Sequence, residues 1–137
     1  MAPFRHRLRV RYHECDPQGI VFNANFLTFA DIAITELYRE AFGGWQAPMD
    51  EHGIDMVVAE ANVRYLAPLR FDEEFELVAS LVRIGRTSTT TLIVVERDDE
   101  RVAEVEIRHV VVDSESRRKA PIPSPVREGL REFSTPE

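Results

Sequence analysis

The stretch from Tyr12 to Phe26, YHECDPQGIVFNANF, joins a strand-like run to a strongly helical one. Before it, arginines and apolar residues alternate over residues 7–12, and this period of two predicts a half-buried strand. The following DPQG predicts a turn, because Pro17 fixes φ and Gly19 tolerates a positive φ. Asp16 therefore stands in a turn directly before a helix. It serves there either as a turn residue that accepts from nearby backbone N–H groups or as a carboxylate with a chemical role.

The segments after this turn predict the fold class. An apolar helix, capped by Asn23 or a neighbour, is expected to run to about Phe42, where Gly43-Gly44 ends it. Its first half is apolar almost all round, which is typical of a buried helix. The segments with strand patterns are Ile54–Leu66, Phe75–Val82, Thr87–Glu96 and Val102–Val112. One early helix and meandering strands predict an α+β domain whose antiparallel sheet curls around the helix. Ser124-Pro125 predicts a short helix near the end of the chain, with Ser124 as its cap and Pro125 in its first turn.

The composition bounds the function. A length of 137 residues predicts a single domain spanning 1–137. The net charge of −7 argues against a nucleic-acid partner, and no apolar run approaches the ~18 residues that span a membrane. The first ten residues have no apolar core of the kind found in signal peptides. Since the one cysteine, Cys15, has no partner for a disulfide within the chain, a cytoplasmic location is expected.

Metal and thiol chemistry have weak support. The spacing of the four histidines, His6, His13, His52 and His109, does not match a metal-binding motif, so no metal is expected. Cys15 lies next to Asp16 and is a candidate nucleophile, although a free cysteine is more often a small buried apolar residue.

A family resemblance rests on three motifs. The pattern Asp16-x-x-Gly19-x-Val21, followed by Phe26 and a long apolar helix, resembles the acyl-CoA thioesterases of the hotdog superfamily, in particular the 4-hydroxybenzoyl-CoA thioesterase and YbgC-like branch. The stretch from Ala59 to Ser88 and the tail RKAPIPSPVREGL extend the similarity over nearly the whole chain.

The resemblance implies a hotdog fold, in which a curved antiparallel sheet wraps around one long central helix. It implies hydrolysis of a CoA thioester to a carboxylic acid and free CoA, with no cofactor other than the CoA of the substrate itself. It also implies a homo-oligomer, a dimer or tetramer, whose sites are shared between subunits.

The same resemblance assigns the central site residues. Asp16 is the expected catalytic carboxylate, as general base or as nucleophile, and both roles stay open. Gly19 and Asn23 are expected to shape the backbone around the thioester carbonyl, with Phe26 in the acyl pocket. Relatives often carry Tyr or His at position 23 and Tyr at position 26, so the acyl group is not specified. Free N–H groups at the helix start would polarise the carbonyl.

Two further carboxylates have two readings each. Asp31 lies in the apolar half of the helix, either as a buried, hydrogen-bonded structural residue or as a group lining the acyl pocket. Glu60 lies either on the solvent face of a strand or in the site of a partner subunit. Trp45, which follows the glycine stop, is a candidate pocket lid or an apolar cap over the helix end.

Two basic clusters are candidates for binding the phosphates of CoA, since Arg binds phosphate through paired hydrogen bonds. The first cluster lies at a strand turn and consists of Arg83, Arg86, Thr87 and Ser88. The second lies in the tail and consists of Arg117, Arg118 and Lys119. Solvated surface charge is the alternative for both.

Two rival functions remain at the level of sequence. A hotdog dehydratase or hydratase needs a base, typically His, and His13 is the histidine close to the turn. A non-catalytic module that binds acyl-CoA or acyl-carrier protein needs the pocket but not Asp16.

Overall fold

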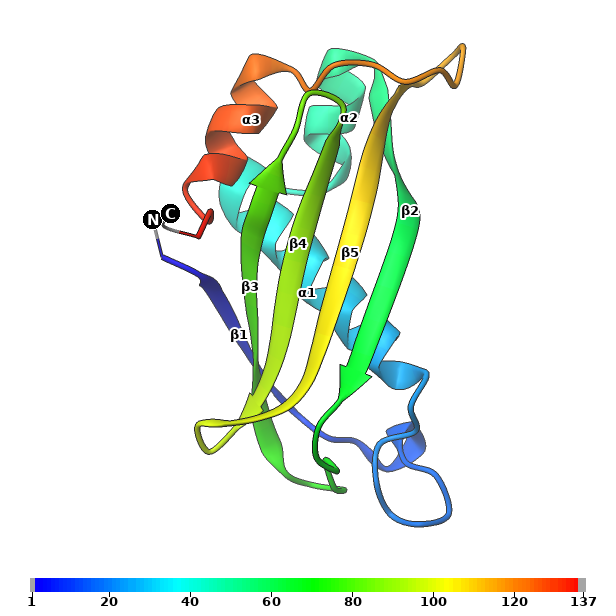
Figure 1. Cartoon of the computed structure of the whole chain (residues 1–137), viewed down its shortest axis with the longest axis vertical. Helices are drawn as coiled ribbons and strands as arrows, with labels where there is room; N and C mark the ends of the chain where they lie inside the picture. Colours follow the sequence, from blue (N-terminus) through cyan, green and yellow to red (C-terminus); the bar gives the residue numbers. More distant parts are fainter. Residues whose placement is uncertain (1, 136–137) are drawn as a thin grey trace.

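The computed structural model describes residues 2–135, which form one sheet and three α-helices (Figure 1). In chain order the elements are β1 (Phe4–Arg9), a 3₁₀ turn η1 (Tyr12–Glu14), α1 (Asn25–Phe42), α2 (Gln46–His52), β2 (Ile54–Tyr65), β3 (Glu74–Ile84), β4 (Ser88–Arg97), β5 (Glu100–Asp113) and α3 (Ser124–Arg131).

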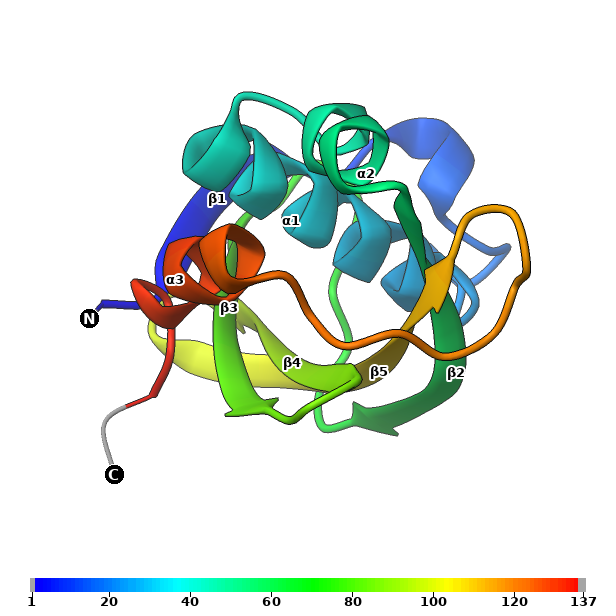
Figure 2. The ribbon, with the colours of Figure 1, turned by 90° about the horizontal axis from the view of Figure 1, so that it is seen from above.

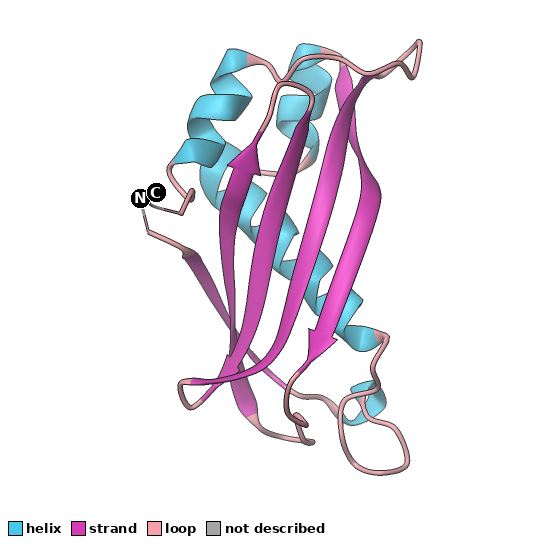
Figure 3. Cartoon of the chain, viewed as in Figure 1, coloured by secondary structure: helices cyan, strands magenta, loops and turns pink. Residues whose placement is uncertain are grey.

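The five strands form one antiparallel sheet in the order β1-β3-β4-β5-β2 (Figure 3). The four longer strands overlap the predicted ranges, and their ends differ from the predicted ends by at most two residues. A two-residue turn at Asp98 and Asp99, both with positive φ (51° and 64°), joins β4 to β5. Such turns match the twist of a hairpin.

The sheet curves around α1, which lies along its concave face, with α2 and α3 beside it (Figure 2). The buried face of α1 consists of Phe26, Phe29, Ala30, Ala33, Ile34, Leu37 and Tyr38. This arrangement confirms the predicted α+β domain with a sheet around a central helix. The expectation that the first half of α1 is buried all round is wrong for the single chain, because Leu27 is 43% exposed and Asp31 is also exposed.

The first strand lies earlier than predicted. It spans Phe4–Arg9 rather than residues 7–12, and Tyr12 lies in η1 with 82% of its surface exposed. The strand ends because the Glu14 carboxylate accepts the Arg11 N–H at 2.7 Å and closes a turn there. Side-chain bonds of this kind compete with a strand ladder, and alternation alone does not reveal them.

The helix ends also differ in detail. α1 begins at Asn25 with Ala24, the neighbour of Asn23, at the cap position, and no side chain makes a capping hydrogen bond there. Gly43 ends the helix at φ 83°, as predicted. The structure adds α2, which the sequence did not indicate, and it places α3 at Ser124–Arg131 with Pro123 rather than Ser124 at the cap.

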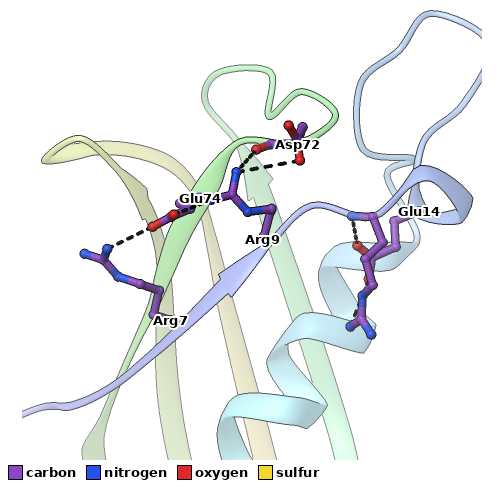
Figure 4. Close-up of polar contacts among 6 residues, drawn as sticks. Arg7, Arg9, Glu14, Asp72 and Glu74 are labelled. Atoms are coloured by element: carbon purple, nitrogen blue, oxygen red, sulfur yellow. Dashed lines mark hydrogen bonds and ion pairs between the residues drawn. The ribbon is translucent and has the colours of Figure 1, made fainter.

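The edge strand β1 carries a row of ion pairs (Figure 4). Arg7 contacts Glu74 at 2.9 Å, and Arg9 contacts both Glu74 and the Asp72 carbonyl. Charged side chains on an edge strand disfavour pairing with another chain. The opposite edge, β2, carries exposed Val57 and Val58 instead. No helix within residues 2–135 is long and apolar enough to span a membrane.

Candidate active site

The loop before α1, the start of α1 and the end of β2 meet at one end of the molecule (Figure 1). A pocket of about 540 Å³ lies between these segments. Its lining residues are Asp16, Gln18, Ile20, Val21, Asn23, Phe26, Tyr65, Leu66, Ala67, Pro68 and Leu69. The volume lies within the range of small-molecule sites. Three of the predicted site residues, Asp16, Asn23 and Phe26, therefore share one pocket.

The turn holds Asp16 in place. The Asp16 N–H donates to the Ile20 carbonyl, and the Gly19 N–H donates to the Asp16 carbonyl, both at 2.9 Å. Gly19 has φ 78°, which explains why a glycine is suited to this position. The Gln18 N–H donates to Asp16 Oδ1 at 2.8 Å, so one carboxylate oxygen is fixed to the backbone. No residue of the described chain donates to Oδ2, which leaves this oxygen for a ligand or water.

The start of α1 is tied to the loop through Glu14. The Glu14 carbonyl accepts the Phe22 N–H at 3.0 Å and the Asn25 side-chain amide at 2.8 Å. The Glu14 side chain is buried and bonds to the Arg11 N–H. Glu14 thus fixes the helix start relative to the turn that carries Asp16.

Two backbone N–H groups just before α1 are free, and one of them belongs to the pocket residue Asn23. Within residues 2–135 the N–H groups of Asn23 and Ala24 donate no hydrogen bond, whereas those of Asn25 and Phe26 donate to the carbonyls of Phe22 and Asn23. Unpaired N–H groups at a helix start carry partial positive charge and stabilise a developing anion. The pocket therefore combines a carboxylate, which can activate or attack, with donors for an oxyanion.

Cys15 is a poor nucleophile in this setting. Burial, followed by the negative charges of Glu14 and Asp16, raises the pKa of its thiol. Its Sγ lies 3.8 Å from the Arg11 carbonyl, where the thiol can donate a weak hydrogen bond. The reactive thiolate is thus disfavoured.

The other two carboxylates do not reach this pocket within one chain. Asp31 is exposed on α1, so the structural reading that placed it as a buried, hydrogen-bonded residue is wrong. Asp31 lies on the same exposed side of α1 as Leu27, which the sheet of the single chain does not cover. Glu60 is exposed on β2 and lies 3.4 Å from Arg108, as expected for the solvent face of a strand.

Both basic clusters lie at the other end of the sheet. The Arg86 carbonyl accepts the Ile122 N–H at 2.9 Å, and the Thr87 carbonyl accepts the Val111 N–H at 2.8 Å, so the β3–β4 turn lies against the tail. Arg83, Arg86 and Arg118 are exposed, Thr87 and Ser88 are half-buried, and Arg117 pairs with Asp55 at the start of β2.

This end is far from Asp16. β2 runs from the cluster to the pocket, and its 12 residues span roughly 36 Å at about 3.3 Å per residue. One chain therefore brings Asp16 and the arginines to opposite ends of the molecule (Figure 1).

Two remaining candidates lie outside the pocket. His13 is exposed and does not line the cavity, which leaves the dehydratase hypothesis without its base. Trp45 packs on Tyr38 and His109, with ring centroids at 4.6 and 5.9 Å, and covers the end of α1 as an apolar cap does.

The sequence analysis missed three residues that build the site. Glu14 and Asn25 join the turn to α1, and the Tyr65 hydroxyl donates to the Asn23 carbonyl at 3.1 Å. Tyr65 and Asn23 are 42 residues apart, so no local pattern indicated that contact.

Comparisons with known proteins agree with this site. A model of the Thioesterase-like superfamily matches residues 10–130. The acyl-CoA thioester hydrolase YbgC of Escherichia coli is 32% identical over 111 residues, which are 80% of this chain and 82% of that protein. A 1,4-dihydroxy-2-naphthoyl-CoA hydrolase of Thermosynechococcus vestitus is 25% identical over 138 residues, covering 99% of this chain and 93% of that protein.

A solved structure supports the fold. The crystal structure of a hypothetical protein from Aquifex aeolicus superposes with a TM-score of 0.86 at 30% sequence identity, over 93% of this chain and 99% of that chain. The expected hotdog fold is confirmed. With a family match across most of its length, the chain belongs to the thioesterase-like superfamily.

Proposed function

We propose that this protein hydrolyses acyl-CoA thioesters to a carboxylic acid and free CoA. The observation that carries the proposal is the pocket lined by both Asp16, with its carboxylate, and Asn23, whose backbone N–H is free at the start of α1. Two of the relatives are named as hydrolases of CoA thioesters, which supports the proposal.

The reaction uses the groups present in the pocket. Asp16 Oδ2 either takes a proton from an attacking water or attacks the thioester carbon itself. The carbonyl electron pair moves onto oxygen, where the N–H groups of Asn23 or Ala24 stabilise the negative charge. Collapse of this intermediate expels CoA thiolate, which leaves as the thiol after protonation. If Asp16 attacks, water then hydrolyses the acyl-Asp16 anhydride. Neither route requires a metal or redox cofactor.

We further propose that the working unit is a homo-oligomer with shared sites. In one chain Arg86 and Arg118 are too far from Asp16 to hold the same CoA molecule. A two-fold axis that pairs β2 with β2 of a second copy reverses the strand direction, and so places the arginine end of one chain beside the Asp16 end of the other.

The surface at this edge fits such pairing. Val58 is 60% exposed and Tyr65 is 54% exposed on β2, and Leu27 is exposed on the neighbouring face of α1. Covering these side chains and the free strand edge would remove an aggregation-prone surface. A dimer satisfies this geometry, and a tetramer of two dimers is compatible with it. We also propose a cytoplasmic location.

The test of the function is Asp16→Asn, assayed by thiol release from a panel of CoA thioesters with short aliphatic, long-chain and aromatic acyl groups. Loss of a positioned acid–base group lowers kcat by about 10²–10⁴-fold. The matched control is Asp99→Asn in the exposed β4–β5 turn, which leaves kcat unchanged. An Asp16→Asn variant that keeps its oligomeric state and turns over as fast as wild type would remove Asp16 from the mechanism. Wild-type protein that binds the esters without releasing thiol would favour the binding module.

A further inference from the structure

One side of the pocket is a short apolar segment between β2 and β3. The polar lining residues are Asp16, Gln18 and Asn23, whereas residues 66–69, with the sequence LAPL, are all apolar. Leu66 is 47% exposed, so its side chain is accessible to a ligand. Since the proposed reaction holds the thioester carbonyl at Asp16 and Asn23, residues 66–69, here called the wall segment, are left to contact the acyl group.

The backbone of the wall segment is held at both ends. At its start, residues 66 and 67 both donate their N–H groups to the Val102 carbonyl of β5, at 2.9 and 3.1 Å. At its end, the Leu69 carbonyl accepts the Val21 N–H at 2.7 Å. Pro68 lies between these contacts and has no N–H, so hydrogen bonds can hold its backbone only through its carbonyl.

Arg97, the last residue of β4, supplies the donor for that carbonyl. Its Nη1 donates to the Pro68 carbonyl at 2.7 Å and to Glu73 Oε1 at 3.1 Å. The same Glu73 oxygen accepts the Arg70 N–H at 2.6 Å, while Nη2 of Arg97 pairs with Glu100. The Arg97 side chain is only 17% exposed. Charged hydrogen bonds of this kind are short and strong, so Arg97 ties the wall segment to the β4–β5 hairpin.

The turn that carries Asp16 has supports of its own. The hydrogen bonds that fix Asp16 come from within residues 16–20. Loss of the Arg97 contacts would therefore release the wall segment while the carboxylate keeps the bonds within its turn.

We propose that Arg97 is a positioning residue that holds the wall segment in place and thereby sets which acyl groups the pocket accepts. The inference rests on the proposed thioester hydrolysis. A large acyl group that contacts the wall segment gains binding energy from it, whereas an acetyl group depends on it least. The effect of a displaced wall segment thus grows with acyl size. Loss of folded protein, by contrast, lowers activity toward all substrates by the same factor.

The kinetic test is Arg97→Met, which keeps a long apolar stem and removes the donors. We measure kcat/KM for a series of CoA esters from acetyl to octanoyl, with benzoyl-CoA added. One methylene in an apolar pocket is worth about 10–200-fold, so the ratio of kcat/KM for the largest to the smallest acyl group hydrolysed should fall about 10-fold. Arg97→Lys keeps the charge between Glu73 and Glu100, which protects folding, and should change the ratio in the same direction by a smaller factor.

The matched control is Arg101→Met. Arg101 lies on the same hairpin, but it is exposed and pairs with Glu104, so its loss should leave the ratio unchanged. If Arg97→Met and Arg97→Lys lower kcat/KM equally for every acyl group, Arg97 is only a structural residue. If Arg97→Met does not fold, Arg97→Lys decides the question, and an unchanged ratio in that variant overturns the proposal.

A second readout does not depend on activity. Amide hydrogen exchange at residues 66 and 67 reports how often their bonds to Val102 open. Exchange there should be faster in Arg97→Met than in wild type or Arg101→Met, while the amide of Ile93 inside β4 keeps its rate. Unchanged exchange at 66 and 67 would show that Arg97 does not hold the wall segment. Faster exchange without altered selectivity, in a protein that hydrolyses thioesters, overturns the selectivity role alone. A wild type that releases thiol from none of the esters overturns the proposed function, and this inference with it.

Discussion

At the residue scale, Asp16 is a turn residue in the structure, and one of its carboxylate oxygens stays available for the proposed chemistry. Its Oδ1 accepts the Gln18 N–H in the turn, while no residue from 2 to 135 donates to Oδ2. The turn bond fixes the carboxylate plane, and a fixed carboxylate loses less conformational entropy when it meets a substrate. The structural use of one oxygen thus supports the chemical use of the other.

His109 gives a prediction at the same scale. It is 5% exposed on β5, and its strand neighbour on β4 is buried Thr89. Burial lowers the pKa of His109, and the negative charge of Asp31 on α1 opposes this only in part. As the pH falls below about 6.5, the unfolded chain takes up a proton at this histidine before the folded chain does, so stability declines from its full value above that pH.

We therefore expect the Tm to fall between pH 7.5 and pH 5, and to fall less in His109→Gln. Differential scanning calorimetry at both pH values measures this change. The matched control is His13→Gln, because His13 is exposed to solvent whereas His109 is buried. Equal pH sensitivity in wild type and His109→Gln would show that other groups govern this range.

At the element scale, α3 closes the fold by packing on the end of α1. A Cβ placed on Gly129 of α3 would lie 2.3 Å from Cε1 of Phe42, closer than atoms can approach without a shift. Glycine costs helix stability, so its presence here reflects the close approach of the two helices.

Gly129→Ala should therefore destabilise the protein by about 1–3 kcal/mol, although alanine is the better helix former. Urea denaturation gives the change in the free energy of unfolding. Gly44→Ala is the control, because a Cβ at Gly44 meets no atom within 4 Å and its backbone is not in the left-handed region. A Gly129→Ala variant as stable as wild type would mean that Phe42 turns aside at no cost.

At the scale of the whole molecule, the separation of Asp16 from Arg86 makes shared sites testable by complementation. Asp16→Asn removes the carboxylate. If Arg86 binds a CoA phosphate as proposed, Arg86→Ala should raise KM by roughly 10- to 100-fold. In a mixed dimer with shared sites, one site carries both defects and the other carries neither.

Co-expression of the two variants should then restore about a quarter of wild-type activity at low substrate concentration, since half of the dimers are mixed and each has one intact site. Light scattering of the wild type should show a dimer or larger species at micromolar concentration. The control is co-expression of Asp16→Asn with Arg39→Ala, a change to an exposed arginine of α1. The activity of this mixture is the amount that chains with intact Asp16 and Arg86 contribute when paired with Asp16→Asn. If Asp16→Asn and Arg86→Ala do not complement, Asp16 and Arg86 do not serve sites shared in this way.

The sequence by itself determined the strands, the central helix and the carboxylate turn, because each rests on local patterns: a period of two, an apolar helix ended by Gly43, and the DPQG at 16–19. The sequence did not predict where the first strand ends near Tyr12, because a hydrogen bond from the Arg11 N–H to the Glu14 side chain ends it.

Only the tertiary structure decided which candidates share a site. The contact between Tyr65 and Asn23, the approach of the Arg86 turn to the tail, and the distance of both basic clusters from Asp16 depend on strand order in the sheet. A pattern along the chain fixes which face a side chain takes, whereas the packing of elements distant in sequence fixes what it meets.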